Sequence, residues 1–142
     1  MMRRPDFTGN WKVNYERSVL RVPPPKNVLV KIEHREPSLI QKMLFTDAEG
    51  NDQQMTFKYE TGAETANSVN GAAARTRTWW EGLELVIETR MKLADRELHF
   101  KDCWSLSDDG RILTMAHRDD DLAGQTSVLE KTSQADATGP DK

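Results

Sequence analysis

The chain has a single cysteine, Cys103, among its 142 residues. One cysteine excludes an intramolecular disulfide and any zinc site built from several thiolates. No apolar run approaches the roughly 20 residues that a membrane-spanning helix requires, so we expect no membrane span. The stability of the folded chain must therefore come from packing within its own core.

Neither sign of charge dominates the sequence. Lysine and arginine contribute 20 residues and aspartate and glutamate 23, which gives a formal net charge of -3. The basic residues are spread along the chain and form no stripe of the kind that a phosphate backbone requires. There is also no glycine-rich phosphate loop and no Ser-His-Asp order. We therefore expect no nucleic acid partner and no cofactor, and composition leaves the oligomeric state open.

The two ends of the chain differ from its middle. The first six residues, MMRRPD, lack the apolar stretch of a secretory signal. The sequence as written predicts a cytoplasmic protein, or a periplasmic or secreted one if a leader was removed. The last eleven residues, TSQADATGPDK, are too polar to join a core. We expect one domain over residues 1–131 and a disordered tail over residues 132–142.

Alternation of apolar and polar residues dominates the middle of the chain, and helical periodicity is nearly absent. Turn residues recur about every ten positions, which is typical of an antiparallel sandwich or barrel. The pattern predicts about ten strands, over residues 11–15, 28–33, 39–46, 53–60, 64–70, 73–80, 83–92, 98–106, 112–118 and 125–131. Ten strands joined by short turns predict an all-β, antiparallel up-and-down barrel, whose interior is either filled by side chains or holds one small ligand.

Several short motifs fall in the order and spacing of a known group of barrels. They are FTGNWK at 7–12, MTFKY at 55–59, WEG at 80–82, SDDG at 107–110 and LEK at 129–131. This layout resembles the calycins, and most closely the intracellular lipid-binding proteins that carry fatty acids and retinoids. The opening is also similar to small bacterial proteins of lipocalin-like type. The resemblance implies a calycin-like barrel that binds or transports a small hydrophobic molecule in its interior.

Two features depart from the lipid-binding family. That family has a helix-turn-helix lid between its first two strands, whereas the connector Glu16–Asn27 carries three consecutive prolines and is too short for two helices. Fatty-acid carriers also hold the ligand carboxylate with an Arg-x-Tyr on the last strand and an arginine two strands earlier. The matching positions here fall near Ser127, Leu129 and Trp104. Without this clamp, we expect a neutral apolar ligand or none.

The apolar faces of the predicted strands, which we expect to point into the barrel, supply the candidate ligand site. Alternation gathers bulky apolar side chains there, together with a few polar ones. We predict that the ligand is bound by Tyr15, Phe57, Tyr59, Arg77, Ile87, Phe100, Asp102, Trp104, Ser127 and Leu129. The alternative is that the same side chains simply fill the barrel.

Asp102 stands out because alternation places its carboxylate between Phe100 and Trp104 on an apolar face. An unpaired charge is costly there, so we expect a partner from Arg75 or Arg77 on a neighbouring segment. A bulge that shifts the register would instead turn Asp102 toward water. An enzyme that uses Asp102 with Arg75 or Arg77 as an acid–base pair in the cavity is one alternative to simple binding.

The remaining candidates for chemistry are His99, Cys103 and His117. A Cys–His nucleophile pair or a two-histidine metal site would need these side chains to converge. Their face alternates with the apolar one, so we expect all three to point outward, and we assign no catalytic and no metal-binding residue. The other alternative is a filled barrel that meets a protein partner through Trp79 or Trp80, whichever faces outward.

Overall fold

The computed structural model describes residues 4–20, 26–69, 71–119 and 124–132. Within these ranges the chain forms ten strands and no helix. The strands are β1 Gly9–Val13, β2 Lys26–Arg35, β3 Ser38–Thr46, β4 Asp52–Glu60, β5 Ala63–Val69, β6 Ala72–Glu81, β7 Glu84–Leu93, β8 Arg96–Leu106, β9 Ile112–Asp119 and β10 Gln125–Thr132. Every predicted strand is present, so the all-β prediction is confirmed.

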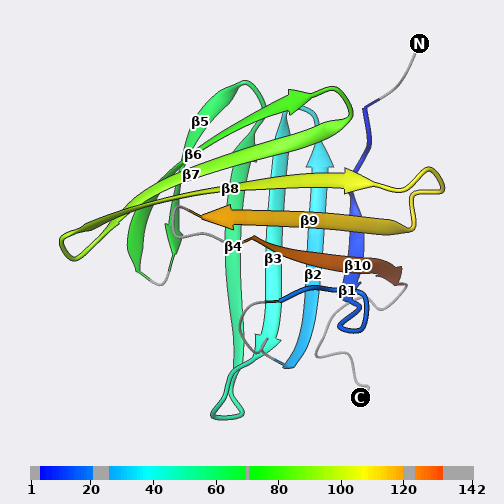
Figure 1. The fold of residues 1–142 in the computed structure, drawn as a ribbon, viewed down its shortest axis with the longest axis horizontal. Helices are drawn as coiled ribbons and strands as arrows, with labels where there is room; N and C mark the ends of the chain where they lie inside the picture. Colours follow the sequence, from blue (N-terminus) through cyan, green and yellow to red (C-terminus); the bar gives the residue numbers. More distant parts are fainter. Residues whose placement is uncertain (1–3, 21–25, 70, 120–123, 133–142) are drawn as a thin grey trace.

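The ten strands form one antiparallel sheet in the order β4-β3-β2-β1-β10-β9-β8-β7-β6-β5. Every strand pairs with at least one neighbour in sequence, as an up-and-down topology requires, and β1 pairs with β10 as well as with β2. Figure 1 shows β2, β3 and β4 running across β7, β8 and β9, because the sheet folds over on itself. The two layers enclose the barrel interior.

Side chains, in place of a backbone ladder, join the two edge strands β4 and β5. The side-chain amide of Asn67 donates to the carbonyl oxygen of Lys58 at 2.9 Å and accepts from its N–H at 2.8 Å. The hydroxyl of Thr65 donates to the same carbonyl at 2.9 Å. An asparagine side chain offers the donor and acceptor of a peptide group, so it replaces a rung of the ladder. We call Asn67, Thr65 and Lys58 the Asn67 clasp, which leaves the barrel nearly closed.

The apolar core gathers around two aromatic side chains of the first strand region. Phe7 and Trp11 are fully buried, and the Trp11 indole N–H donates to the Phe7 carbonyl at 3.0 Å. The Phe7 ring stacks on Trp80 and meets Trp104 edge-on, with centroids 6.1 and 5.6 Å apart. Aromatic pairs in these arrangements add to the free energy gained by burial. Trp104 also borders the interior cavity described below.

His34 ties the N-terminal segment to this core. Its Nδ1 accepts the Phe7 backbone N–H at 3.2 Å, so the proton lies on Nε2 and is donated to Glu36 Oε1 at 2.9 Å. The second oxygen of Glu36 accepts from the Thr61 hydroxyl and the Trp80 indole. Although partial burial opposes the shift, these hydrogen bonds hold the pKa of Glu36 below its ordinary value. One carboxylate thus links β2, β6 and the segment before β5.

The predicted proline-rich connector is described only in part, because residues 21–25 lie outside the described ranges. Its residues 16–20 contain no helix, and Val19 exchanges two backbone hydrogen bonds of 2.8 Å with Thr126 of β10. The predicted tail over residues 132–142 also lies outside the described residues, except for Thr132, which ends β10. In the described part of the chain, no helix is long and apolar enough to cross a membrane.

Candidate functional site: the barrel cavity

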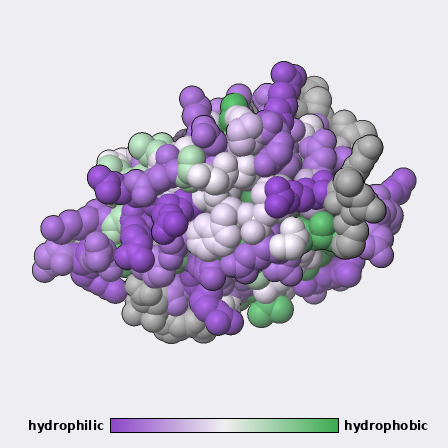
Figure 2. All heavy atoms as spheres, turned by 90° about the horizontal axis from the view of Figure 1, so that it is seen from above, coloured by the Kyte–Doolittle hydropathy of each residue, from purple (hydrophilic) through white to green (hydrophobic). Residues whose placement is uncertain are grey.

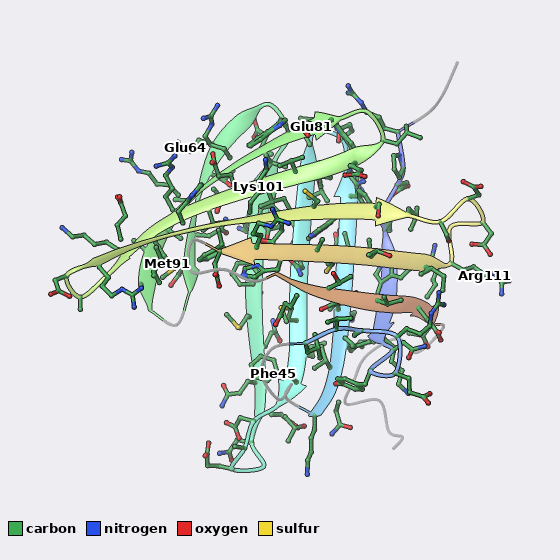
Figure 3. The ribbon with its side chains drawn as sticks, in the orientation of Figure 1. Phe45, Glu64, Glu81, Met91, Lys101 and Arg111 are labelled. Atoms are coloured by element: carbon green, nitrogen blue, oxygen red, sulfur yellow. The ribbon has the colours of Figure 1, made fainter. Side chains whose placement is uncertain are left out.

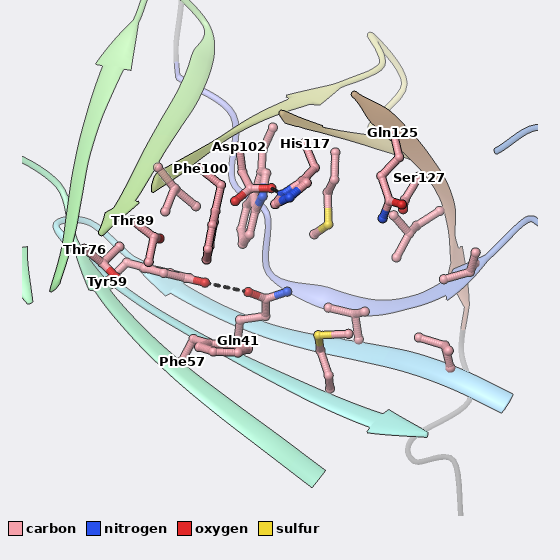
Figure 4. Close-up of a pocket in the computed structure, with 18 of the residues that line it drawn as sticks. Gln41, Phe57, Tyr59, Thr76, Thr89, Phe100, Asp102, His117, Gln125 and Ser127 are labelled. Atoms are coloured by element: carbon pink, nitrogen blue, oxygen red, sulfur yellow. Dashed lines mark hydrogen bonds and ion pairs between the residues drawn. The ribbon is translucent and has the colours of Figure 1, made fainter. Parts of the chain in front are cut away.

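A cavity of about 390 Å³ lies inside the barrel. This volume falls within the range of roughly 300–1,000 Å³ that is typical of small-molecule sites. Most of the lining is apolar, and polar side chains reach the cavity at a few points (Figure 4). The lining residues are Val13, Tyr15, Leu20, Val28, Val30, Gln41, Met43, Phe57, Tyr59, Asn67, Thr76, Ile87, Thr89, Phe100, Asp102, Trp104, Met115, His117, Gln125, Ser127 and Leu129.

The structure brings all but one of the predicted site residues to this cavity. Those that line it are Tyr15, Phe57, Tyr59, Ile87, Phe100, Asp102, Trp104, Ser127 and Leu129. Tyr15 lies beyond the end of β1 and is 42% exposed, so it borders the mouth, whereas Ile87, Trp104 and Leu129 are buried. Their contribution to binding stays a prediction.

Arg77 is the exception, and the predicted pairing of Asp102 with Arg75 or Arg77 is wrong. Both arginines are exposed on the outer face of β6, where the Arg77 guanidinium lies 5.8 Å from the Trp79 ring centroid. The inward positions of β6 are taken by small side chains such as Thr76, which is 1% exposed. Figure 3 shows other charged side chains, Glu64 and Arg111 among them, likewise projecting away from the barrel.

His117 is the partner of Asp102. The register across β7, β8 and β9 is unbroken, and it places Asp102 opposite Ile87 on one side and His117 on the other. No bulge therefore turns Asp102 toward water, and its side chain faces the cavity. Nδ1 of His117 lies 2.8 Å from Oδ1 of Asp102, and the Phe100 ring packs against the imidazole with centroids 5.3 Å apart.

The prediction that His117 points outward with His99 and Cys103 is wrong for His117 only. Because His117 is the cross-strand partner of Asp102, the two side chains share the inner face. His99 lies on the outer face of β8, and its Nε2 is 2.7 Å from a Glu88 oxygen. Burial, with the negative charge of Glu84 adding, raises the pKa of the Cys103 thiol. In the described ranges, no group of three His, Cys, Asp or Glu side chains is arranged to hold a metal ion.

A second polar pair lies across the cavity wall from β3 to β4. The Tyr59 hydroxyl donates to Gln41 Oε1 at 2.9 Å, which Figure 4 marks as a dashed line. The Tyr59 ring meets Trp104 edge-on at 5.9 Å. Enclosure of the hydroxyl, with the negative charge of Asp102 adding, raises the pKa of Tyr59 far above its ordinary value. The phenol therefore stays protonated and donates a hydrogen bond to Gln41.

The sequence reasoning missed several lining residues. Gln41, Thr76 and Thr89 are polar side chains on inward positions, and nothing in an alternating pattern marks a buried polar residue as different from a solvent-facing one. Met43 and Met115 are apolar, as expected of lining residues, but they are not in the predicted ligand-binding set. No described lining residue is a lysine or an arginine.

No protein-family model matches the chain, and no curated protein sequence matches it. Its fold, however, is shared by solved structures. Secretory abundant heat soluble protein 4 from Ramazzottius varieornatus is similar at a TM-score of 0.63 and 13% identity, over 93% of this chain and 99% of that one. Wild-type fluorescent protein UnaG is similar at a TM-score of 0.61 and 15% identity, over 89% and 97%. The fold is a calycin-type β-barrel.

Another solved structure, of a secretory abundant heat soluble protein from the same organism, extends the likeness. Its TM-score is 0.65 at 13% identity, over 88% of this chain and 94% of that chain. The calycin-type barrel is therefore shared over nearly the whole length of both compared chains, as the sequence motifs predicted. At these identities the likeness concerns the fold alone, and the chemistry has to be argued from the cavity.

Proposed function

We propose that this calycin-type barrel reversibly binds a small, mainly apolar molecule that carries no carboxylate. The observation that carries the proposal is the cavity of about 390 Å³ with its largely apolar lining and no lysine or arginine among its described residues. A largely apolar cavity releases water when a ligand of matching shape enters. No covalent step is implied.

Burial of apolar surface supplies enough free energy for this function. A ligand that buries about 300 Å² of apolar surface gains roughly 7 kcal/mol before the costs of association. Tyr59, Trp104 and Phe100 are rigid aromatic walls, so little side-chain entropy is lost when a ligand packs on them. Useful affinity is thus available without a charged clamp.

The direct test is native mass spectrometry of protein purified from its own host, with denaturing extraction of any bound molecule. Titration with a panel of neutral and acidic lipophiles, followed by tryptophan fluorescence, complements it because Trp104 borders the cavity. A co-purified small molecule or saturable quenching is expected. A clean apo mass with no quenching by any lipophile would contradict the proposal.

A matched pair of variants localises the binding. Ser127→Phe places a ring inside the cavity from β10, whereas Ala116→Phe places the same ring on the exposed outer face of β9. We expect Ser127→Phe to abolish binding and Ala116→Phe to preserve it. Equal binding by both variants would move the site away from the barrel interior.

The alternative functions lose the features on which they rested. The acid–base pair of an enzyme required Arg75 or Arg77 beside Asp102, and both arginines face outward. An interaction module required a filled barrel, whereas this barrel contains a cavity. The face drawn in Figure 2 is mostly hydrophilic, and Trp79, which faces outward, is half-buried beside Arg77 and Lys101.

A further inference from the structure

The electrostatic character of the cavity is set by one carboxylate and one imidazole. Among the described lining residues, Asp102 is the only carboxylic acid and His117 the only imidazole, and none is a lysine or an arginine. Asp119, opposite Phe100 on the same face of β9, carries a charge of the same sign as Asp102. The basic side chains nearest in sequence, such as Lys101, alternate to the outer face. A ligand in the cavity therefore meets one carboxylate with its imidazole partner, and no lysine or arginine.

One oxygen of Asp102 is available to a ligand. Oδ1 is taken by His117 at 2.8 Å, and within the described part of the chain Oδ2 has no hydrogen-bond partner. The side chains of Asp102 and His117 are 23% and 31% exposed, and both line the cavity. Figure 4 shows the carboxylate lying within the cavity beside the imidazole. The imidazole fixes the direction of the carboxylate, so His117 is a positioning residue.

The hydroxyl of Tyr59, which also lines the cavity, is already engaged. It donates a hydrogen bond to Gln41 Oε1 at 2.9 Å, so it is not free to donate to a ligand carboxylate. A ligand carboxylate would be dehydrated beside Asp102 with no lysine or arginine in the lining to compensate, which is unfavourable. A ligand N–H would instead form a charge-assisted hydrogen bond with Oδ2, which is about twice as strong as a neutral one.

We propose that the ligand carries a nitrogen donor, most simply a protonated primary amine, which binds Oδ2 of Asp102 while the apolar body packs on Trp104 and Phe57. The inference rests on the proposed function and narrows it. It replaces the neutral ligand that the sequence predicted, because that prediction followed from a missing clamp and did not include an unpaired carboxylate oxygen. Amphipathic amines are the chemical class that this cavity fits.

The test compares three probes with the same apolar chain, namely octylamine, 1-octanol and octanoic acid, by calorimetric titration of the full chain near pH 7. We expect octylamine to bind at least about tenfold more tightly than octanoic acid, with 1-octanol in between. In the near-isosteric variant Asp102→Asn, the affinity for octylamine should fall about tenfold and that for 1-octanol should change less than about threefold. Asp95→Asn, in the exposed turn between β7 and β8, makes the same chemical change outside the cavity and should alter neither.

The outcomes separate this inference from the function on which it rests. If all three probes bind and octanoic acid binds as tightly as octylamine, the cavity is a binding site and the amine inference is wrong. Unchanged octylamine affinity in a folded Asp102→Asn variant has the same meaning. If none of the probes binds the wild-type chain, both proposals fail. If circular dichroism shows that Asp102→Asn does not fold, the preference of the wild-type chain for octylamine over octanoic acid decides whether the amine inference holds.

Discussion

Replacing Asn67 by alanine should loosen the junction between β4 and β5 without disturbing the rest of the sheet. The change removes three hydrogen bonds of the Asn67 side chain, two of 2.8 and 2.9 Å to the backbone of Lys58 and one of 3.3 Å to the Thr76 hydroxyl. Each such bond contributes about 0.5–1.5 kcal/mol net, so the loss lies between about 1.5 and 4.5 kcal/mol. Lys58 is exposed, and water replaces part of what is lost there, which places the expected value at about 1.5–3 kcal/mol.

Urea unfolding followed by tryptophan fluorescence measures the global effect, and hydrogen exchange of the Lys58 amide measures the local one. The Lys58 N–H should be protected in the wild type and exchange rapidly in Asn67→Ala. Asn67→Asp keeps the acceptor and removes the donor, so it should fall between the two. Ser68→Ala changes the exposed neighbour on the same strand and serves as the control. Full protection of the Lys58 amide in Asn67→Ala would refute the clasp.

Three further outcomes follow from the packing. The ionised Glu36 side chain stabilises the fold fully above its ordinary pKa of 4.5, and this stabilisation is lost as the pH falls through the lower pKa of the folded state. Glu36→Gln should therefore lower the stability at neutral pH. The same variant should show a smaller fall of the urea midpoint in acid than the wild type. A variant as acid-sensitive as the wild type would contradict this. Trp104→Ala should cost about 3 kcal/mol by urea unfolding, at the low end for a buried aromatic because one side already faces open space, and should weaken ligand binding in calorimetry. Trp79→Ala, on the outer face, should leave ligand binding unchanged in the same titration, and a loss of binding there would place the ligand outside the barrel.

The strands were predictable because their faces differ in polarity. In β7, Leu85, Ile87 and Met91 alternate with charged neighbours and are buried as predicted. The same strand also shows the limit of this rule. Val86 faces outward and is still fully buried, since it lies in register between Trp79 and Cys103. Burial on the outer face depends on the size of cross-strand neighbours, which alternation along one strand does not report.

Two predictions at the site were wrong, the outward direction of His117 and the inward direction of Arg77. The first depends on strand register, and the second on threonine side chains that face the barrel interior. The facing of His117 depends on how the turn at 107–111 sets the pairing of β9 with β8, and a one-residue difference reverses every side chain. Arg77 was placed inward because it shares a face with Trp79, whereas the inward face of β6 is built from residues such as Thr76 that read as polar. The cavity volume was beyond prediction, because it is the small difference between the barrel's interior and the summed volumes of its side chains.

The Asn67 clasp has a consequence for the behaviour of the protein at high concentration. Strands β4 and β5 are the edges of the sheet, and the clasp occupies the backbone N–H and carbonyl oxygen of Lys58 on β4. If the clasp opens, both edges become available at once, and each can pair with the complementary edge of another molecule. We therefore expect the Asn67 side chain to limit edge-to-edge aggregation of the barrel as well as to join its two edge strands.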